Sequence, residues 1–158
     1  MFKEAIARDR RAVQIGAIVT AIATIVLFVI PELLLEEMDA FKLWYWEQTG
    51  RRIDRDNPLG PVRFLGGALG GAVAGYRTSA LGSGGVNGAK AAVYGLAIMV
   101  VIVFVGLSGV YVYLGGPRHT PWIFNAVVPT LYALLLAAPH LIGGALAGAA
   151  AYRLHDQE

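Results

Sequence analysis

The sequence contains no cysteine and has few charged residues. None of its 158 residues is Cys, and 15% are Asp, Glu, Lys or Arg. Without cysteine, the chain cannot form a disulfide bridge, a thiolate metal site or a cysteine nucleophile. Average soluble domains carry about 25% charged residues, so this composition argues against a soluble domain. The formal charge of +2 is also too small to indicate a nucleic-acid partner, and we expect none.

Apolar residues make up 56% of the chain and gather in four long runs. A helix crosses the hydrocarbon core of a bilayer, about 30 Å thick, with about 20 apolar residues. The runs predict membrane spans at about residues 13–35, 61–81, 89–114 and 122–152. The Gly- and Ser-rich residues 82–90 predict a tight, flexible turn between the second and third spans. We therefore expect an all-α fold, an integral membrane four-helix bundle that forms one domain over residues 1–158.

Two similar runs of very small residues occupy the second and fourth predicted spans. Residues 66–77 read GGALGGAVAGYR, and residues 143–153 read GGALAGAAAYR. Each interior glycine weakens a helix in water by about 1 kcal/mol relative to alanine. In a bilayer the helix is nearly obligatory, and a strip of glycines lets two helices approach closely. We interpret both runs as helix-packing faces, formed by Gly66, Gly67, Gly70, Gly71, Gly75, Gly144 and Gly148.

The chain also divides into two helix pairs. In each pair a bulky apolar helix precedes a small-residue helix that ends in Tyr-Arg. This pattern predicts two parallel helix-pair repeats related by an axis along the membrane normal, with convergent small-residue packing as the alternative. The second and fourth spans are expected near the centre of the bundle, and both chain ends on one side. Basic residues before the first span favour the cytoplasmic side for both ends.

Two polar segments are expected at the membrane surface. Residues 1–11 either anchor the chain to anionic lipid or form the solvated start of the first helix. Residues 37–50 predict an amphipathic interfacial segment, because Trp and Tyr favour the membrane–water boundary. The same region has the composition of a partner-docking patch, and both interpretations stay open. The residues concerned are Trp44, Tyr45, Trp46, Arg51 and Arg52.

His140 is the one ionisable side chain deep within a predicted span, and it directly follows Pro139. An intramembrane histidine can be a ligand or a proton relay. The other two histidines fall in a predicted loop and in the tail, and no carboxylate is expected beside His140. We therefore prefer a neutral histidine that is bonded to a backbone carbonyl freed by Pro139. No catalytic, cofactor or metal site is predicted.

The stretch from residue 61 to residue 96 contains FLGGALGGAVAGY, a short Gly-rich turn and NGAKAAVYGL. It resembles an uncharacterised family of small four-helix membrane proteins of halophilic archaea. The ending PHLIGGALAGAAAY resembles the last helix of that family, so the resemblance covers about residues 61–153. It implies four spans and an archaeal or archaeal-virus membrane. The family has no assigned activity, so no functional residue carries over, and the Trp-rich connection departs from its pattern.

These observations favour a non-enzymatic membrane protein. The predicted spans lack the buried carboxylates and nucleophile–base pairs that transport and catalysis usually need. The excess of helix-packing faces predicts a structural or accessory subunit of a larger membrane assembly, with membrane lipid and other subunits or further copies of itself as partners. The alternative is a small channel or transporter, with a glycine-lined path and His140 near its midpoint.

Overall fold

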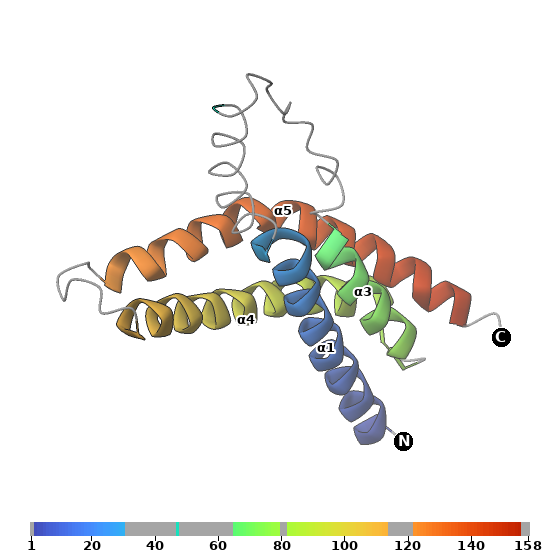
Figure 1. Ribbon diagram of the computed structural model, residues 1–158. Coiled ribbons are helices and arrows are strands. Elements are labelled where there is room, and N and C mark those ends of the chain that lie inside the picture. Colours follow the sequence, from blue (N-terminus) through green and yellow to red (C-terminus); the bar gives the residue numbers. More distant parts are fainter. Residues whose placement is uncertain (1, 31–46, 48–64, 80–81, 114–121, 156–158) are drawn as a thin grey trace.

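The computed structural model describes residues 2–30, 47, 65–79, 82–113 and 122–155, and these form an all-α bundle (Figure 1). Helix α1 (Phe2–Thr24) continues into the π-helical turn η1 (Ile25–Val29). The later helices are α3 (Leu65–Arg77), α4 (Gly84–Tyr113) and α5 (Trp122–His155). No strand occurs in these described ranges. The predicted fold class is confirmed.

Three helical segments are long and apolar enough to cross a membrane: Phe2–Val29, Gly84–Gly106 and Pro129–His155. Helix α3 is different, because its 13 residues extend about 20 Å at 1.5 Å per residue. That length is less than the hydrocarbon core of about 30 Å. The described part of the second predicted span is thus a short helix packed among three longer ones.

Helix α1 begins at Phe2, so the basic N-terminal segment is the start of the first helix, which is one of its two interpretations. One predicted boundary is wrong. Helix α4 begins at Gly84, inside the predicted flexible turn. Its first turn is fixed by Ser83, whose Oγ accepts the Val86 N–H at 3.4 Å and whose carbonyl accepts the Asn87 N–H at 2.9 Å. This is the pairing expected of a serine N-cap.

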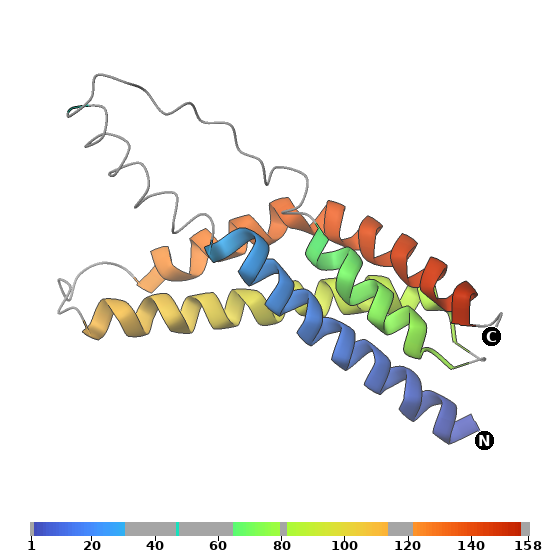
Figure 2. The ribbon, with the colours of Figure 1, turned by 45° about the vertical axis from the view of Figure 1, so that its right-hand side comes forward.

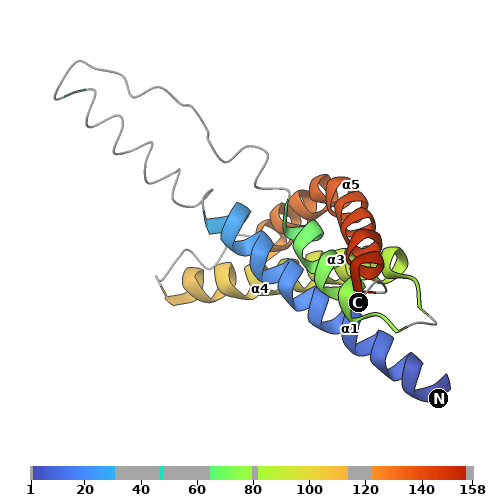
Figure 3. The ribbon, with the colours of Figure 1, turned by 90° about the vertical axis from the view of Figure 1, so that its right-hand side faces the viewer.

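Successive helices run in alternating directions. The Arg8 Nε donates to the Arg77 carbonyl at 3.3 Å, which places the end of α3 beside the start of α1. The rings of Tyr76 and His155, 4.7 Å apart, bring the end of α5 to the same place. Helix α3 lies between α1 and α5 in Figures 2 and 3 and also contacts α4. The expected central position of the second span is therefore confirmed. The same expectation for the fourth span is wrong, because α5 packs on α3 and α4 and lies on the side of the bundle opposite α1.

Burial within the described helices is the reverse of that in a soluble protein, where large apolar side chains fill the interior. Leu134, Leu135 and Leu146 are 66%, 75% and 68% exposed. The buried residues are mostly Gly, Ala and Thr, with one small apolar cluster of Ala21, Leu96, Met99 and Leu136. A bilayer solvates such an outer surface, and the three long apolar helices fit a membrane protein.

Helix α5 remains helical through both of its prolines, Pro129 and Pro139. It bends near its middle, which is the expected effect of a proline that removes an i→i−4 hydrogen bond (Figure 1). The first part of α5 and the last part of α4 project together beyond the ends of α1 and α3 (Figures 1 and 2). We call this projecting pair of helix ends the α4–α5 extension.

Candidate functional site

Helices α3 and α5 meet along a row of glycines. A Cβ added to Gly71 would lie 2.5 Å from the Gly144 Cα, and one added to Gly75 would lie 2.6 Å from the Gly148 Cα. One turn earlier, a Cβ on Gly67 would lie 2.5 Å from the His140 Cα. The contacts advance by four residues on both helices in the same direction, so α3 and α5 pack in parallel with their backbones in contact.

The same row continues onto the other two helices. A Cβ on Gly16 of α1 would lie 2.5 Å from the Gly70 carbonyl oxygen of α3. A Cβ on Gly88 of α4 would meet the carbonyl of Gly144 and would lie 3.1 Å from the Gly148 Cα. Gly144 and Gly148 of α5 are thus enclosed by α3 on one side and α4 on the other. All seven glycines predicted as packing residues are buried at this junction.

His140 lies at one end of the glycine row and is fully buried, with 0% of its surface exposed. Its Nε2 is 3.0 Å from the Thr24 Oγ1 of α1, immediately before the π-helical turn. The Thr24 hydroxyl donates to the Thr20 carbonyl at 2.7 Å, so its lone pairs are left to accept from the histidine. We infer that the neutral ring carries its proton on Nε2.

Two polar atoms beside this bond lack partners among the described residues. They are the Thr20 Oγ1 and the His140 Nδ1. The histidine is therefore held by a hydroxyl of another helix, whereas we predicted a backbone carbonyl freed by Pro139. In the part of the chain that the structure describes, no group of three or more His, Asp or Glu residues is placed to bind a metal ion.

A second polar cluster joins the helix ends where α1 and α4 begin. The Asp9 Oδ1 accepts the Ser79 N–H at 2.7 Å, just beyond α3. The Asn87 Nδ2 donates to the Thr78 Oγ1 at 3.1 Å, and that hydroxyl donates to the Ala74 carbonyl at 2.8 Å. Sequence reasoning missed this cluster. Asn87, a polar residue in a sequence window of small residues, was the available signal.

The predicted interfacial residues Trp44, Tyr45, Trp46, Arg51 and Arg52 lie outside the described residues. The candidate site is thus the junction of glycines around His140, built from all four helices. Comparisons with family models, with curated proteins and with solved structures found no match for the chain. The functional argument therefore rests on the geometry of the junction and on the surface around it.

Proposed function

We propose that the protein is a non-enzymatic structural or accessory subunit of a larger membrane assembly. The observation that carries the proposal is a contrast between two sets of glycines. The junction glycines are each enclosed by a neighbouring helix, whereas a Cβ added to Gly106 or Gly109 of α4 would have no atom of another helix within 4 Å among the described residues. Because small residues in membrane helices mark places where another helix approaches, these two glycines favour a partner outside the described chain.

The surroundings of Gly106 and Gly109 support this proposal. Both lie near the end of α4 (Gly84–Tyr113). The end of this helix belongs to the α4–α5 extension, which projects beyond α1 and α3 (Figure 2). Neighbouring side chains on α4 are apolar and exposed, with Val101 and Val105 each 60% accessible. A helix surface that contacts only lipid does not require glycine. The presence of Gly106 and Gly109 there therefore favours contact with a second helix, from another subunit or from another copy of this chain.

The alternative function, a channel with a glycine-lined path, has less support. In the described residues the glycine faces are filled by neighbouring helices, and a single added carbon at Gly71 or Gly75 would collide with backbone. Such contacts hold helices together and leave no path between them. The proposal also places both chain ends in the cytoplasm, following the basic N-terminal segment, and, following the resemblance, in an archaeal membrane.

The test is extraction from the native membrane in mild detergent, with quantitative mass spectrometry of the co-purifying proteins. We expect the wild type to carry partners, or copies of itself, in fixed stoichiometry. Gly106→Leu/Gly109→Leu should lose them, because the new side chains would occupy the space of the docking helix. Ala97→Leu is the matched control, since Ala97 is also a small exposed residue of α4 but lies before the α4–α5 extension.

A wild-type protein that runs as a lone monomer would contradict the accessory role. So would a stable complex that the Gly106→Leu/Gly109→Leu variant retains unchanged. In the monomer case, ion flux through reconstituted protein, compared with His140→Ala, would become the informative measurement. A variant that loses partners but keeps its helical circular dichroism separates lost docking from lost folding.

A further inference from the structure

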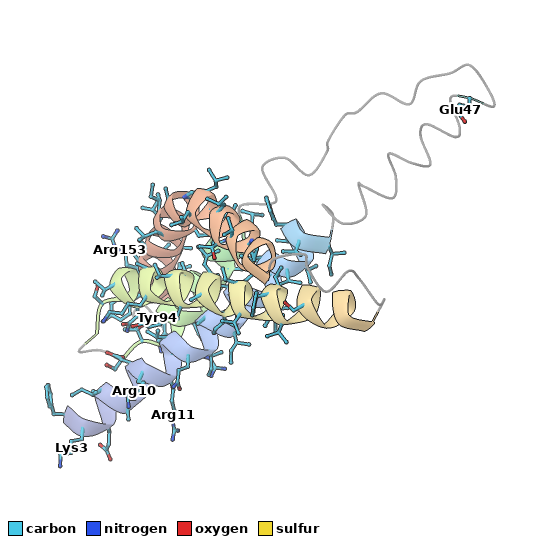
Figure 4. All side chains as sticks on the ribbon, turned by 90° about the vertical axis from the view of Figure 1, so that its left-hand side faces the viewer. Lys3, Arg10, Arg11, Glu47, Tyr94 and Arg153 are labelled. Atoms are coloured by element: carbon cyan, nitrogen blue, oxygen red, sulfur yellow. The ribbon has the colours of Figure 1, made fainter. Side chains whose placement is uncertain are left out.

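A groove of about 800 Å³ lies between α1 and α4, on the outside of the bundle. Its lining includes the polar residues Arg10, Gln14, Lys90 and Tyr94 and the apolar residues Ile6, Ile18 and Ile98. Binding clefts of about this size accept molecules with a few polar groups and an extended apolar portion. Figure 4 shows Arg10 projecting from α1 and Tyr94 lying on α4 beside it.

The lining residues of the groove follow one another along the two helices. On α1, Arg10 precedes Ile18 by eight residues, and on α4, Lys90 precedes Ile98 by the same number. Eight residues of helix extend about 12 Å. The two helices run in parallel here, because a Cβ on Gly95 would meet Thr20 while one on Gly16 would meet Ala91. Both cations therefore lie nearer than Ile18 and Ile98 to the ends where α1 and α4 begin, and Ile6 lies on the other side of Arg10 along α1. We call this part of the groove its polar end.

The cations at the polar end have no protein counter-ion within the described residues. Arg10 and Lys90 are exposed, and neither is involved in a hydrogen bond or an ion pair there. Lys90 is also the one charged residue in the candidate span Gly84–Gly106. A charge inside a membrane helix normally snorkels to the surface or pairs with an opposite charge. An anion at the membrane surface would satisfy both cations.

Asp9 also lines the groove, but its carboxylate is engaged elsewhere. Its Oδ1 accepts the Ser79 N–H at 2.7 Å, on the side of α3. The groove thus contains two free cations against one carboxylate already bonded to backbone. A second groove beside α1 contains Arg8, Arg11 and Arg77, but it also contains Glu4, and its Arg8 Nε is bonded to the Arg77 carbonyl. In the α1–α4 groove the one carboxylate is bonded to backbone, and both cations lack a protein partner among the described residues.

We propose that the α1–α4 groove binds a phospholipid with an anionic headgroup. Arg10 and Lys90 contact the phosphate, Gln14 and Tyr94 donate hydrogen bonds to the headgroup, and Ile18 and Ile98 contact an acyl chain. Phosphate oxygens suit these donors because charge-assisted hydrogen bonds are stronger than neutral ones. This lipid site is independent of the proposed accessory role, since it uses neither Gly106 nor Gly109.

The test is native mass spectrometry of the purified full chain in neutral detergent. Phosphatidylglycerol and phosphatidylcholine with identical acyl chains are added in equal amounts. Each basic residue near a membrane surface strengthens anionic-lipid binding about fivefold, so we expect phosphatidylglycerol to be retained about 25-fold better than phosphatidylcholine. Arg10→Gln/Lys90→Gln should remove this preference. Arg10→Lys/Lys90→Arg should keep it, because both charges remain.

Lys3→Gln/Arg153→Gln is the matched control. Both residues are exposed, the change in net charge is identical, and neither residue lines the groove (Figure 4). This variant should keep the wild-type preference for phosphatidylglycerol. Equal loss in both double variants would overturn the site, because the effect would then come from net charge alone.

Two further results would also overturn the proposal. Equal retention of phosphatidylcholine by the wild type would mean that the groove contacts acyl chains without selecting the headgroup. Retention of free glycerol phosphate, at the same concentration and with the same dependence on Arg10 and Lys90, would make the site one for a soluble anion. Circular dichroism of each variant verifies that its helices are intact.

Discussion

At the scale of single residues, the hydrogen bond between His140 and Thr24 joins the first helix to the last. Both side chains are fully buried, so loss of this bond would leave the His140 Nε2 as well as its Nδ1 without a partner among the described residues, at a cost in stability. Thr24 is the last residue before the π-helical turn η1, so the residue that binds His140 lies where α1 changes from an α-helix to a π-helix. Such turns are rare in α-helices and often adjoin functional residues.

Thr24→Val is expected to destabilise the bundle, because it removes the hydroxyl that accepts from His140 and leaves the ring without a partner. Interhelical hydrogen bonds in membranes contribute on average about 0.6 kcal/mol, with a maximum of about 1.7 kcal/mol, so the loss should be about 1 kcal/mol. Thermal unfolding in detergent measures it.

Thr20→Val is the matched control for Thr24→Val. Thr20 is also fully buried, and it also faces a glycine of α3, Gly70. Its hydroxyl, however, has no partner among the described residues. Thr20→Val should therefore leave the melting temperature unchanged or raise it. Equal destabilisation by the two substitutions would show that the space beside the glycines, and not the hydrogen bond, determines the effect.

The role of His140 was only partly predictable from the sequence. Its position deep in an apolar run identifies it as a buried polar group. Its partner could not be found in this way, because Thr24 is 116 positions away and threonine is common in membrane helices. The backbone carbonyl freed by Pro139 was the nearest partner in the sequence. Reasoning from neighbouring residues could therefore identify that carbonyl but not a threonine on another helix.

At the scale of helices, the glycine row determines which faces meet. The four-residue spacing predicted packing faces, and those glycines are buried at backbone contacts between α3, α5 and α4. The four-residue spacing of the glycines does not indicate which helix packs against which other helix. That depends on the alternating directions of the helices and on α3 lying between α1 and α5. The start of α4 was mispredicted because the Gly-rich segment was interpreted as a turn, although Ser83 caps it as a helix.

Gly71→Ala should lower the melting temperature, because its new methyl group would lie 2.5 Å from the Gly144 Cα, and backbone atoms cannot move aside. Overpacking of this kind costs about 1–3 kcal/mol. Gly143→Ala is the control on the facing helix, since its methyl group would lie 3.6 Å from Ala68 at ordinary contact distance. It should have no effect or a stabilising one. If both substitutions destabilise equally, close backbone contact is not what the glycines provide.

At the scale of the whole molecule, the arrangement of the helices determines the topology in the membrane. The polar cluster around Asp9 ties the start of α1 to the end of α3, and Gly84 of α4 packs against Tyr152 of α5. Four helix ends thus gather at one end of the bundle. The chain has no cysteine, so a maleimide reacts with a single-cysteine variant only at the introduced residue and shows on which side of the membrane that residue lies. Lys3→Cys and Arg153→Cys should react from the same side of sealed vesicles with a membrane-impermeant maleimide.

Glu47→Cys should react from the opposite side, because most of the candidate membrane span Phe2–Val29 lies between Lys3 and Glu47 in the chain. If the basic N-terminal segment is cytoplasmic, Glu47→Cys is the variant labelled on intact cells, and the other two are labelled after permeabilisation. The two parts of the result are separable. Labelling of Lys3→Cys and Arg153→Cys on intact cells would show that the orientation is the reverse of the one predicted, and it would leave the arrangement of the helices unchanged. Labelling of Glu47→Cys from the same side as Lys3→Cys would contradict the crossing of α1 itself, and with it the four-helix arrangement in the bilayer.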